Sequence, residues 1–180
     1  MKLFIASDIH GSYYYLEKLI QEYKKEHYDN IVLLGDILYH GPRNDLPNGY
    51  EPKKVINALN ELKDNIICVR GNCDAEVDNM VLGFDVTADY LELDYNGSRI
   101  FVTHGHKYNK ETPPNFKKGD ILLHGHTHVP ACEDLGEYVY INPGSVSIPK
   151  ENSWHGYMVF NNGVFTWFDL DGNIKKTFKI

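Results

Sequence analysis

Three short apolar runs, separated by two segments with helical periodicity, occupy the first half of the chain. The runs lie at residues 3–6, 31–34 and 66–69, and each has the length of a buried strand. Between them, Ser12 can cap one helix and Pro52 suits the first turn of another. This β-α-β-α-β order predicts parallel strands with right-handed helical crossovers, and it restricts the chain to an α/β fold.

The second half of the chain has strand patterns and hardly any helical ones. Residues 90–95 and 100–103 flank Asn96-Gly97, which is a strong signal for a β-hairpin. Further short strands are expected at residues 121–124, 138–141, 156–160 and 164–169, and a short helix near residues 76–82. At 180 residues, the chain is expected to form a single domain over positions 1–180.

Polar residues follow almost every predicted strand. Because the carboxyl ends of parallel strands meet at one edge of a sheet, we expect these residues to lie close together. Five of the nine histidines fall between positions 104 and 128, which concentrates imidazoles in the same region. The predicted metal ligands are Asp8, His10, Asp36, Asn72, His104, His126 and His128.

The residue types in this set indicate a hydrolytic centre with two metal ions. In an extended segment, His126 and His128 point the same way and could address one ion or two. A purely structural role for the whole set would require many unrelated buried polar pairings. Oxygen and imidazole ligands without thiolate suit Mn²⁺, Fe²⁺, Ni²⁺ or Zn²⁺ better than Mg²⁺. Two such ions are typical of hydrolysis at phosphorus.

The order of the blocks resembles that of the calcineurin-like metallophosphoesterase superfamily: Asp-x-His, Gly-Asp, Gly-Asn, His and Gly-His-x-His. The segments at 41–44, 71–74 and 142–145 are similar to those of its YfcE-type bacterial phosphodiesterase branch. The resemblance implies a four-layer α-β-β-α sandwich of two mixed sheets, with a dinuclear metal site at one edge. It also implies a phosphoric diester hydrolase that attacks a small organic phosphodiester with a metal-bridging hydroxide.

The resemblance further assigns the ligands to two ions, for which it suggests Mn²⁺. Asp36 would bridge the ions, since one carboxylate can offer an oxygen to each. Asn72 would give a neutral carbonyl oxygen, which keeps the site positive enough to bind a phosphate. One ion would be held by Asp8, His10, Asp36 and His128, and the other by Asp36, Asn72, His104 and His126.

Cys73 departs from the superfamily pattern, in which a histidine at this position helps to protonate the leaving group. A thiol is a poor general acid at neutral pH compared with imidazole. Cys73 could be a small buried apolar residue, or the enzyme could favour esters with acidic leaving groups. A third interpretation is that His40 or His106 replaces the missing imidazole.

Two further residues are candidates for the catalytic region. Asp74 is expected to support the ligands from behind or to stabilise the turn after its strand. Arg43 lies in the long irregular segment 40–51, and it could close over a phosphate because it follows Asp36 by seven positions.

The net charge of −7 argues against a protein that binds long nucleic acids, so a small phosphodiester is the expected partner. Three widely spaced cysteines favour a reducing cytoplasm over a disulfide framework. No signal peptide or membrane segment is expected, and the sequence leaves homo-oligomerisation open. The alternative functions are a phosphomonoesterase of the same fold and a non-catalytic scaffold resembling a vacuolar sorting subunit. The complete ligand set argues against the scaffold.

Overall fold

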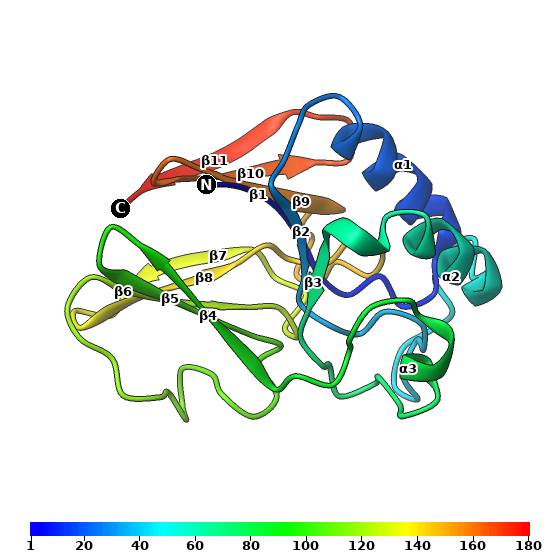
Figure 1. Cartoon of the computed structure of the whole chain (residues 1–180), viewed down its shortest axis with the longest axis horizontal. Coiled ribbons are helices and arrows are strands. Elements are labelled where there is room, and N and C mark those ends of the chain that lie inside the picture. The colour runs from blue at the N-terminus through cyan, green and yellow to red at the C-terminus, as the bar shows by residue number, and fades with distance from the viewer.

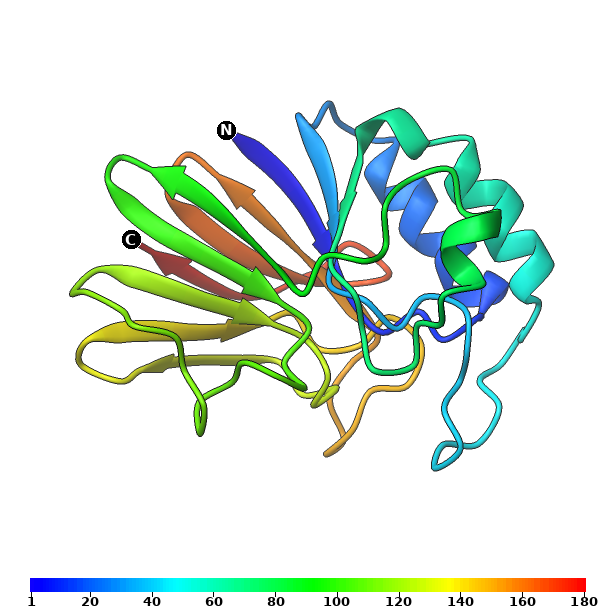
Figure 2. The same ribbon diagram turned by 60° about the horizontal axis from the view of Figure 1, so that its bottom comes forward.

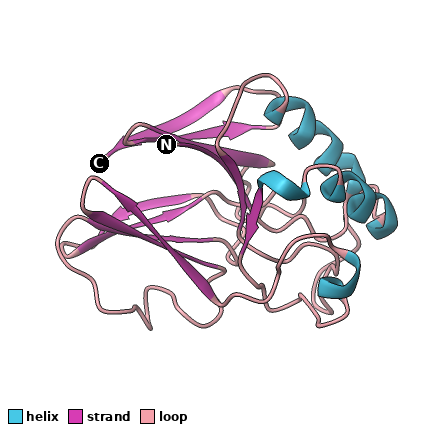
Figure 3. Cartoon of the chain, in the orientation of Figure 1, coloured by secondary structure: helices cyan, strands magenta, loops and turns pink.

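The structure is a computed structural model that describes all 180 residues. In chain order the elements are β1 (Lys2–Ala6), α1 (Tyr13–Tyr23), β2 (Asn30–Leu33), α2 (Pro52–Asn60), the 3₁₀ helix η1 (Lys63–Asn65), β3 (Ile66–Cys68), α3 (Asp78–Val81), β4 (Tyr90–Tyr95), β5 (Ser98–Thr103), β6 (Asp120–His124), β7 (Ala131–Asp134), β8 (Tyr138–Asn142), β9 (Gly156–Asn161), β10 (Val164–Asp169) and β11 (Ile174–Lys179). The strands form two sheets that face each other, as Figures 1 and 3 show.

Both sheets are mixed, and each has a parallel centre. The six-stranded sheet has the order β11-β10-β9-β1-β2-β3, in which β1, β2 and β3 are parallel. The five-stranded sheet has the order β4-β5-β6-β8-β7, in which β5, β6 and β8 are parallel. The predicted β-α-β-α-β unit and the predicted hairpin of β4 and β5 are both confirmed.

Helices α1 and α2 cover the outer face of the six-stranded sheet (Figure 1). Ser12 caps α1 by accepting a hydrogen bond from the backbone N–H of Tyr15, and Pro52 occupies the first turn of α2. Alternate residues of β1 point to opposite faces of its sheet. Phe4 packs on the helices, and Ile5 packs between the sheets.

The core between the two sheets is almost entirely apolar. Trp167 is fully buried there, and its indole N–H donates to the carbonyl oxygen of Asn142 at 2.7 Å. This hydrogen bond ties β10 of one sheet to the end of β8 in the other. The other members of this core include Leu3, Ile5, Val32, Leu34, Ile100, Val102, Ile121, Leu123, Ile141, Met158, Phe160 and Phe165.

The predicted sandwich of two mixed sheets is confirmed. A loop, and not a helix, covers the outer face of the five-stranded sheet. The segment between β5 and β6 places Tyr108 and Phe116 against Phe101 and Tyr138 on the outer face of that sheet. Pro113-Pro114 lies in the middle of this segment and prevents a continuous helix there.

The strands β7 and β11 were not predicted, and each lies at the edge of its sheet. The segment of β11 carries three lysines and is mostly exposed, so it has no alternation of apolar residues. Charged edge strands of this kind oppose pairing with another chain. No helix is both long and apolar enough to cross a membrane, and all three cysteines are free thiols.

Candidate metal centre

The predicted ligands gather where the carboxyl ends of the parallel strands of both sheets meet. Asp8 and His10 follow β1, Asp36 follows β2, and His104 follows β5 without a gap. Figure 2 shows the loops that project from this end of the sandwich. The clustering that the sequence predicts for these residues is therefore seen in the fold.

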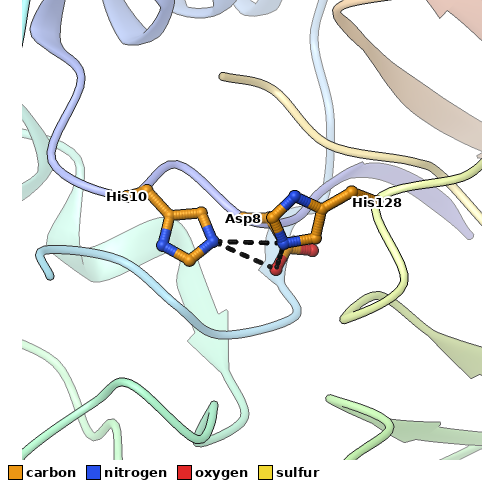
Figure 4. A group of neighbouring side chains, drawn as sticks. All are labelled: Asp8, His10 and His128. Carbon is orange, nitrogen blue, oxygen red and sulfur yellow. Dashed lines mark hydrogen bonds and ion pairs between the residues drawn. The ribbon is translucent and has the colours of Figure 1, made fainter. Parts of the chain in front are cut away.

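Asp8, His10 and His128 form the first group, shown in Figure 4. Asp8 Oδ1 is 3.2 Å from His128 Nε2 and 3.6 Å from His10 Nε2, and the two Nε2 atoms are 3.3 Å apart. Asp36 Oδ2 lies 3.7 Å from the same His10 Nε2. Three potential ligand atoms thus lie close together, and Asp36 approaches them through His10.

The second group surrounds His104, whose Nε2 is 3.5 Å from Asp36 Oδ2. The same nitrogen is 3.1 Å from Asn72 Oδ1 and 3.1 Å from His126 Nδ1. Asp36 Oδ2 therefore faces a ligand nitrogen in each group, which is the arrangement that a bridging carboxylate needs.

The atoms in the centre are arranged for a cation rather than for each other. His10, His104 and His128 each bond their Nδ1 to a backbone carbonyl, so the Nε2 lone pairs are left pointing inward. The acceptors are the carbonyl oxygens of Tyr39, Leu34 and Ile148, at 2.7, 2.6 and 2.6 Å. Asp8 Oδ1 is buried without any hydrogen-bond partner. A metal ion would satisfy these electron-rich atoms, so the residues fit a dinuclear site.

The electrostatics of the centre also favour positive charge. Burial raises the pKa of Asp8, but the close imidazoles of His10 and His128 outweigh burial and hold this pKa well below its usual range. Burial lowers the pKa of His104 in the metal-free chain, but its close approach to Asp36 and the charges of Asp8 and Asp36 raise it to about 9, so an ion bound here would take the place of a proton on Nε2. The two buried carboxylates thus stabilise a cation in their midst.

The backbone of the ligand loops is unusual. Five predicted ligands adopt a positive φ, a conformation that costs of order 1–3 kcal/mol in non-glycine residues. Gly71 allows a close approach, since a Cβ added there would lie 2.1 Å from Asp36 Oδ1. Strain at so many neighbouring positions is typical of a functional site. The five are Asp8 (59°), His10 (48°), Asp36 (55°), His126 (66°) and His128 (63°).

Asp74 lies behind the centre and points away from the predicted ligand atoms. Its carboxylate accepts hydrogen bonds from the backbone N–H groups of Asp36, Ile37 and Gly71, at 2.8, 2.8 and 2.7 Å. These contacts join the loops after β2 and β3. The geometry therefore gives Asp74 a supporting role.

Serines of the segment after β8 also support the centre, and no sequence pattern predicted a role for them. Ser145 and Ser147 donate hydroxyl hydrogen bonds to the carbonyl oxygen of Asp8, at 2.9 and 3.1 Å. Ser7 donates to Asp8 Oδ2 at 2.5 Å, which leaves Oδ1 for an ion. Only the resemblance at 142–145 could have pointed to this segment.

A pocket of about 460 Å³, here called the cationic pocket, opens beside the centre. Arg43, which the sequence suggests could close over a phosphate, lines this pocket, and Lys150 is a second cation that the sequence analysis missed. Neither cation forms an ion pair within the chain. Lys150 lies in an irregular segment, so no pattern marked it. The lining residues are Asp36, Gly41, Pro42, Arg43, Asn44, Asn72, Cys73, His126, Thr127, His128 and Lys150.

Cys73 lies in the wall of the cationic pocket, whereas His40 and His106 do not line it. The backbone N–H of Cys73 donates a hydrogen bond to Asp36 Oδ1 at 2.8 Å. Burial and the charge of Asp36 raise the pKa of its thiol to about 12, so the group stays protonated at neutral pH. Cys73 therefore faces the pocket, whereas the ring of His106 lies on the other side of the ligands, with its centroid 5.5 Å from that of His104.

The chain matches a known family over most of its length. Residues 1–162 match the family described as the Calcineurin-like phosphoesterase superfamily domain. Phosphodiesterase YfcE of Escherichia coli (strain K12) is 46% identical over 171 residues, which cover 95% of this chain and 93% of that protein. Probable metallophosphoesterase YsnB of Bacillus subtilis (strain 168) is 28% identical over 187 residues, covering 96% and 94%.

Solved structures agree with these sequence matches. The structure of the phosphoesterase YfcE from E. coli superposes with a TM-score of 0.96 at 44% identity, covering 100% of both chains. Vps29 from Entamoeba histolytica, solved in complex with Zn²⁺, has a TM-score of 0.63 at 16% identity, covering 99% of both chains. The likeness to this vacuolar sorting protein is one of fold alone.

Proposed function

The chain belongs to the calcineurin-like phosphoesterase superfamily, and on that premise we propose that it hydrolyses small organic phosphodiesters at a centre of two divalent ions. The observation that carries the proposal is the pair of ligand groups that share Asp36. Asp36 Oδ2 is 3.7 Å from His10 Nε2 and 3.5 Å from His104 Nε2. One carboxylate between two clusters of lone pairs suits two neighbouring ions.

Each ion would be held by four residues of the chain. When bound, the ions supply a hydroxide nucleophile near neutral pH and neutralise charge on the phosphate. Asp74 fixes the backbone around Asp36, and Ser145 fixes that around Asp8, so the ligands need little rearrangement. The first ion would have Asp8, His10, Asp36 and His128, and the second Asp36, Asn72, His104 and His126.

Arg43 and Lys150 would bind the phosphate oxygens that the ions leave free. Both line the cationic pocket, and both lack an internal acidic partner. The main chain of Lys150 is tied to a predicted ligand, because its N–H donates to the carbonyl oxygen of His128 at 3.1 Å. A cation placed in this way can orient an anion relative to the ions.

We propose Mn²⁺ as the ion because the resemblance to the superfamily suggests it; the mixed oxygen and imidazole ligands also suit Fe²⁺, Ni²⁺ and Zn²⁺. A protonated Cys73 thiol is a weak proton donor, so esters of acidic alcohols should react best. A phosphomonoesterase is the second candidate, because the same centre could bind a terminal phosphate.

The test is to reload metal-free protein with Mn²⁺, Ni²⁺, Zn²⁺ or Mg²⁺. Each form is assayed with bis(p-nitrophenyl) phosphate and with p-nitrophenyl phosphate. We expect the highest turnover with Mn²⁺ and the diester, and no turnover without metal. A higher kcat/KM for the monoester would contradict the diesterase assignment. The variant Asp36→Asn, which lacks the shared carboxylate, should lose most of this activity. Asp64→Asn, on the exposed surface of η1, is its matched control and should retain full activity.

A further inference from the structure

A second pocket, here called the acidic pocket, adjoins the candidate centre and has the opposite charge. Its volume is about 360 Å³, and it shares His126 and Thr127 with the cationic pocket. The two pockets therefore lie on either side of the segment that carries His126 and Thr127. A phosphodiester bound at the ions has two alcohol arms that point away from phosphorus, so one arm can reach each side.

The charges in the acidic pocket favour a cation. Three glutamates line it, and Lys110 is the only basic residue among the lining side chains apart from histidines. Glu133 is already paired, with its carboxylate oxygens 3.1 and 3.0 Å from Lys110 Nζ. Glu111 and Glu151 have no ion pair, so two negative charges remain available.

The contacts of Lys110 show that this pocket can bind a primary ammonium. Besides its pair with Glu133, Lys110 Nζ lies 5.2 Å from the centroid of the Tyr140 ring, which is within the range of a cation–π contact. An aromatic face and a carboxylate are the groups that a ligand ammonium would also use.

A buried acceptor without a donor lines the same pocket. His124 is only 2% exposed, and its ring stacks on Tyr140 with centroids 4.5 Å apart. Its Nδ1 is 3.0 Å from the carbonyl oxygen of Gly125, so Nδ1 carries the proton and Nε2 is an acceptor. Nε2 has no hydrogen-bond partner in the chain. A donor can satisfy this acceptor, and either a ligand in the pocket or a water molecule can supply it.

We propose that the acidic pocket binds an alcohol arm of the phosphodiester that carries a protonated amine. The inference rests on the proposed diesterase function and deepens it. Glu111 and Glu151 attract the ammonium, whereas Arg43 and Lys150 repel it from the other pocket. The opposite charges of the two pockets thus fix the orientation of an asymmetric substrate.

The experiment compares three diesters that share a p-nitrophenyl leaving group and differ in the retained arm. The arms are 2-aminoethyl, its uncharged isostere propyl, and 2-hydroxyethyl, and the readout is the ratio of kcat/KM values. In the wild type we expect the aminoethyl ester to exceed the propyl ester by about tenfold, as two exposed ion pairs of a few-fold each would give. In the double variant Glu111→Gln with Glu151→Gln, the ratio should fall close to one.

Glu137→Gln, at an exposed position between β7 and β8 outside both pockets, is the matched control and should leave the ratio unchanged. Bis(p-nitrophenyl) phosphate has no amine, so its kcat/KM should be equal in wild type and double variant. A wild-type ratio near one, a ratio that survives the double replacement, or a preference for the hydroxyethyl arm over the aminoethyl arm would overturn the proposal. The proposed diesterase function is tested separately by wild-type hydrolysis of bis(p-nitrophenyl) phosphate, which would fail only if that function were wrong.

Discussion

The two halves of the candidate metal centre differ in burial and in support. Asp8 and His10 are 0% exposed and His128 is 3% exposed, whereas Asn72 is an exposed residue and His126 is partly exposed. Each ring of the first half bonds its Nδ1 to a backbone carbonyl, but His126 turns its Nδ1 toward His104. The first half, here called the buried half, is therefore suited to retain an ion tightly, whereas Asn72 and His126 give the second half an open edge beside the buried His104, and we call it the open half.

Asp36→Asn should have the largest effect, because Asp36 joins the two halves. An amide in place of the bridging carboxylate removes one negative charge and one good ligand oxygen. We expect metal content to fall below two ions per chain and kcat to fall by about 10²–10³-fold, the scale lost with one key electrostatic group. Elemental analysis of Mn²⁺-saturated protein gives the stoichiometry. Two ions in the variant would show that Asp36 does not bridge.

Asn72→Ala and His10→Ala should separate the two halves. Asn72 is exposed, so its loss should remove the second ion and lower kcat by about 10²-fold without changing the melting temperature of the metal-free protein. His10→Ala leaves the Asp8 carboxylate buried with one partner fewer, so the melting temperature of the metal-free protein should fall by several degrees. Equal melting temperatures for the two variants would mean that the halves are supported alike.

His104 shows that a position just after a predicted strand does not reveal whether a residue can be replaced without loss of the fold. A residue that follows a predicted strand is expected to lie in a loop, where its removal would spare the fold, but His104 is 0% exposed and bonds to the carbonyl oxygen of Leu34. A loop residue at the junction of two sheets can be as buried as any core residue. Asn72 is therefore the better choice for a variant that spares the fold.

The sequence predicted the parallel strands and the cluster of ligands because both follow from local patterns. Asp8 and Asp36 come directly after apolar runs, and parallel pairing brings those ends together. The edge strands β7 and β11 could not be predicted in this way, since their charge-rich segments carry no apolar run or alternation, unlike the edge strands β3 and β4. Lys150 was missed for a related reason, because its place beside the centre depends on a hydrogen bond to His128 in a distant segment.

Arg43→Met and Lys150→Met should test whether the open half binds the phosphate. Each change removes a cation of the cationic pocket but no predicted ligand. We expect KM for bis(p-nitrophenyl) phosphate to rise by about tenfold, the scale of one charge-assisted hydrogen bond, with little change in kcat. Lys53→Met on the exposed side of α2 is the matched control. A fall in kcat at unchanged KM would instead indicate that the cation acts only in the transition state.

Cys73→His should have the smallest effect. A change in its preference among leaving groups would show that the leaving group departs through the open half. An acidic nitrophenol can leave as an anion, whereas an alkoxide needs a proton in the transition state, which an imidazole can supply. Cys73 lines the cationic pocket, so a larger side chain at position 73 has space there into which it can extend. We expect the ratio of kcat/KM for an alkyl ester to that for a nitrophenyl ester to rise about fivefold, below the roughly 10²-fold of an optimally placed acid.

The comparison requires equal metal loading, because Cys73 is close to Asp36 and a new imidazole could bind an ion itself. Cys132→His, on the distant edge strand β7, is the matched control for the introduction of a histidine and should leave the ratio unchanged. An unchanged ratio in fully metallated Cys73→His would mean that position 73 does not face the leaving oxygen. The thiol would then be a packing residue of the loop, and the open half would have to release its alcohol without an acid at this position.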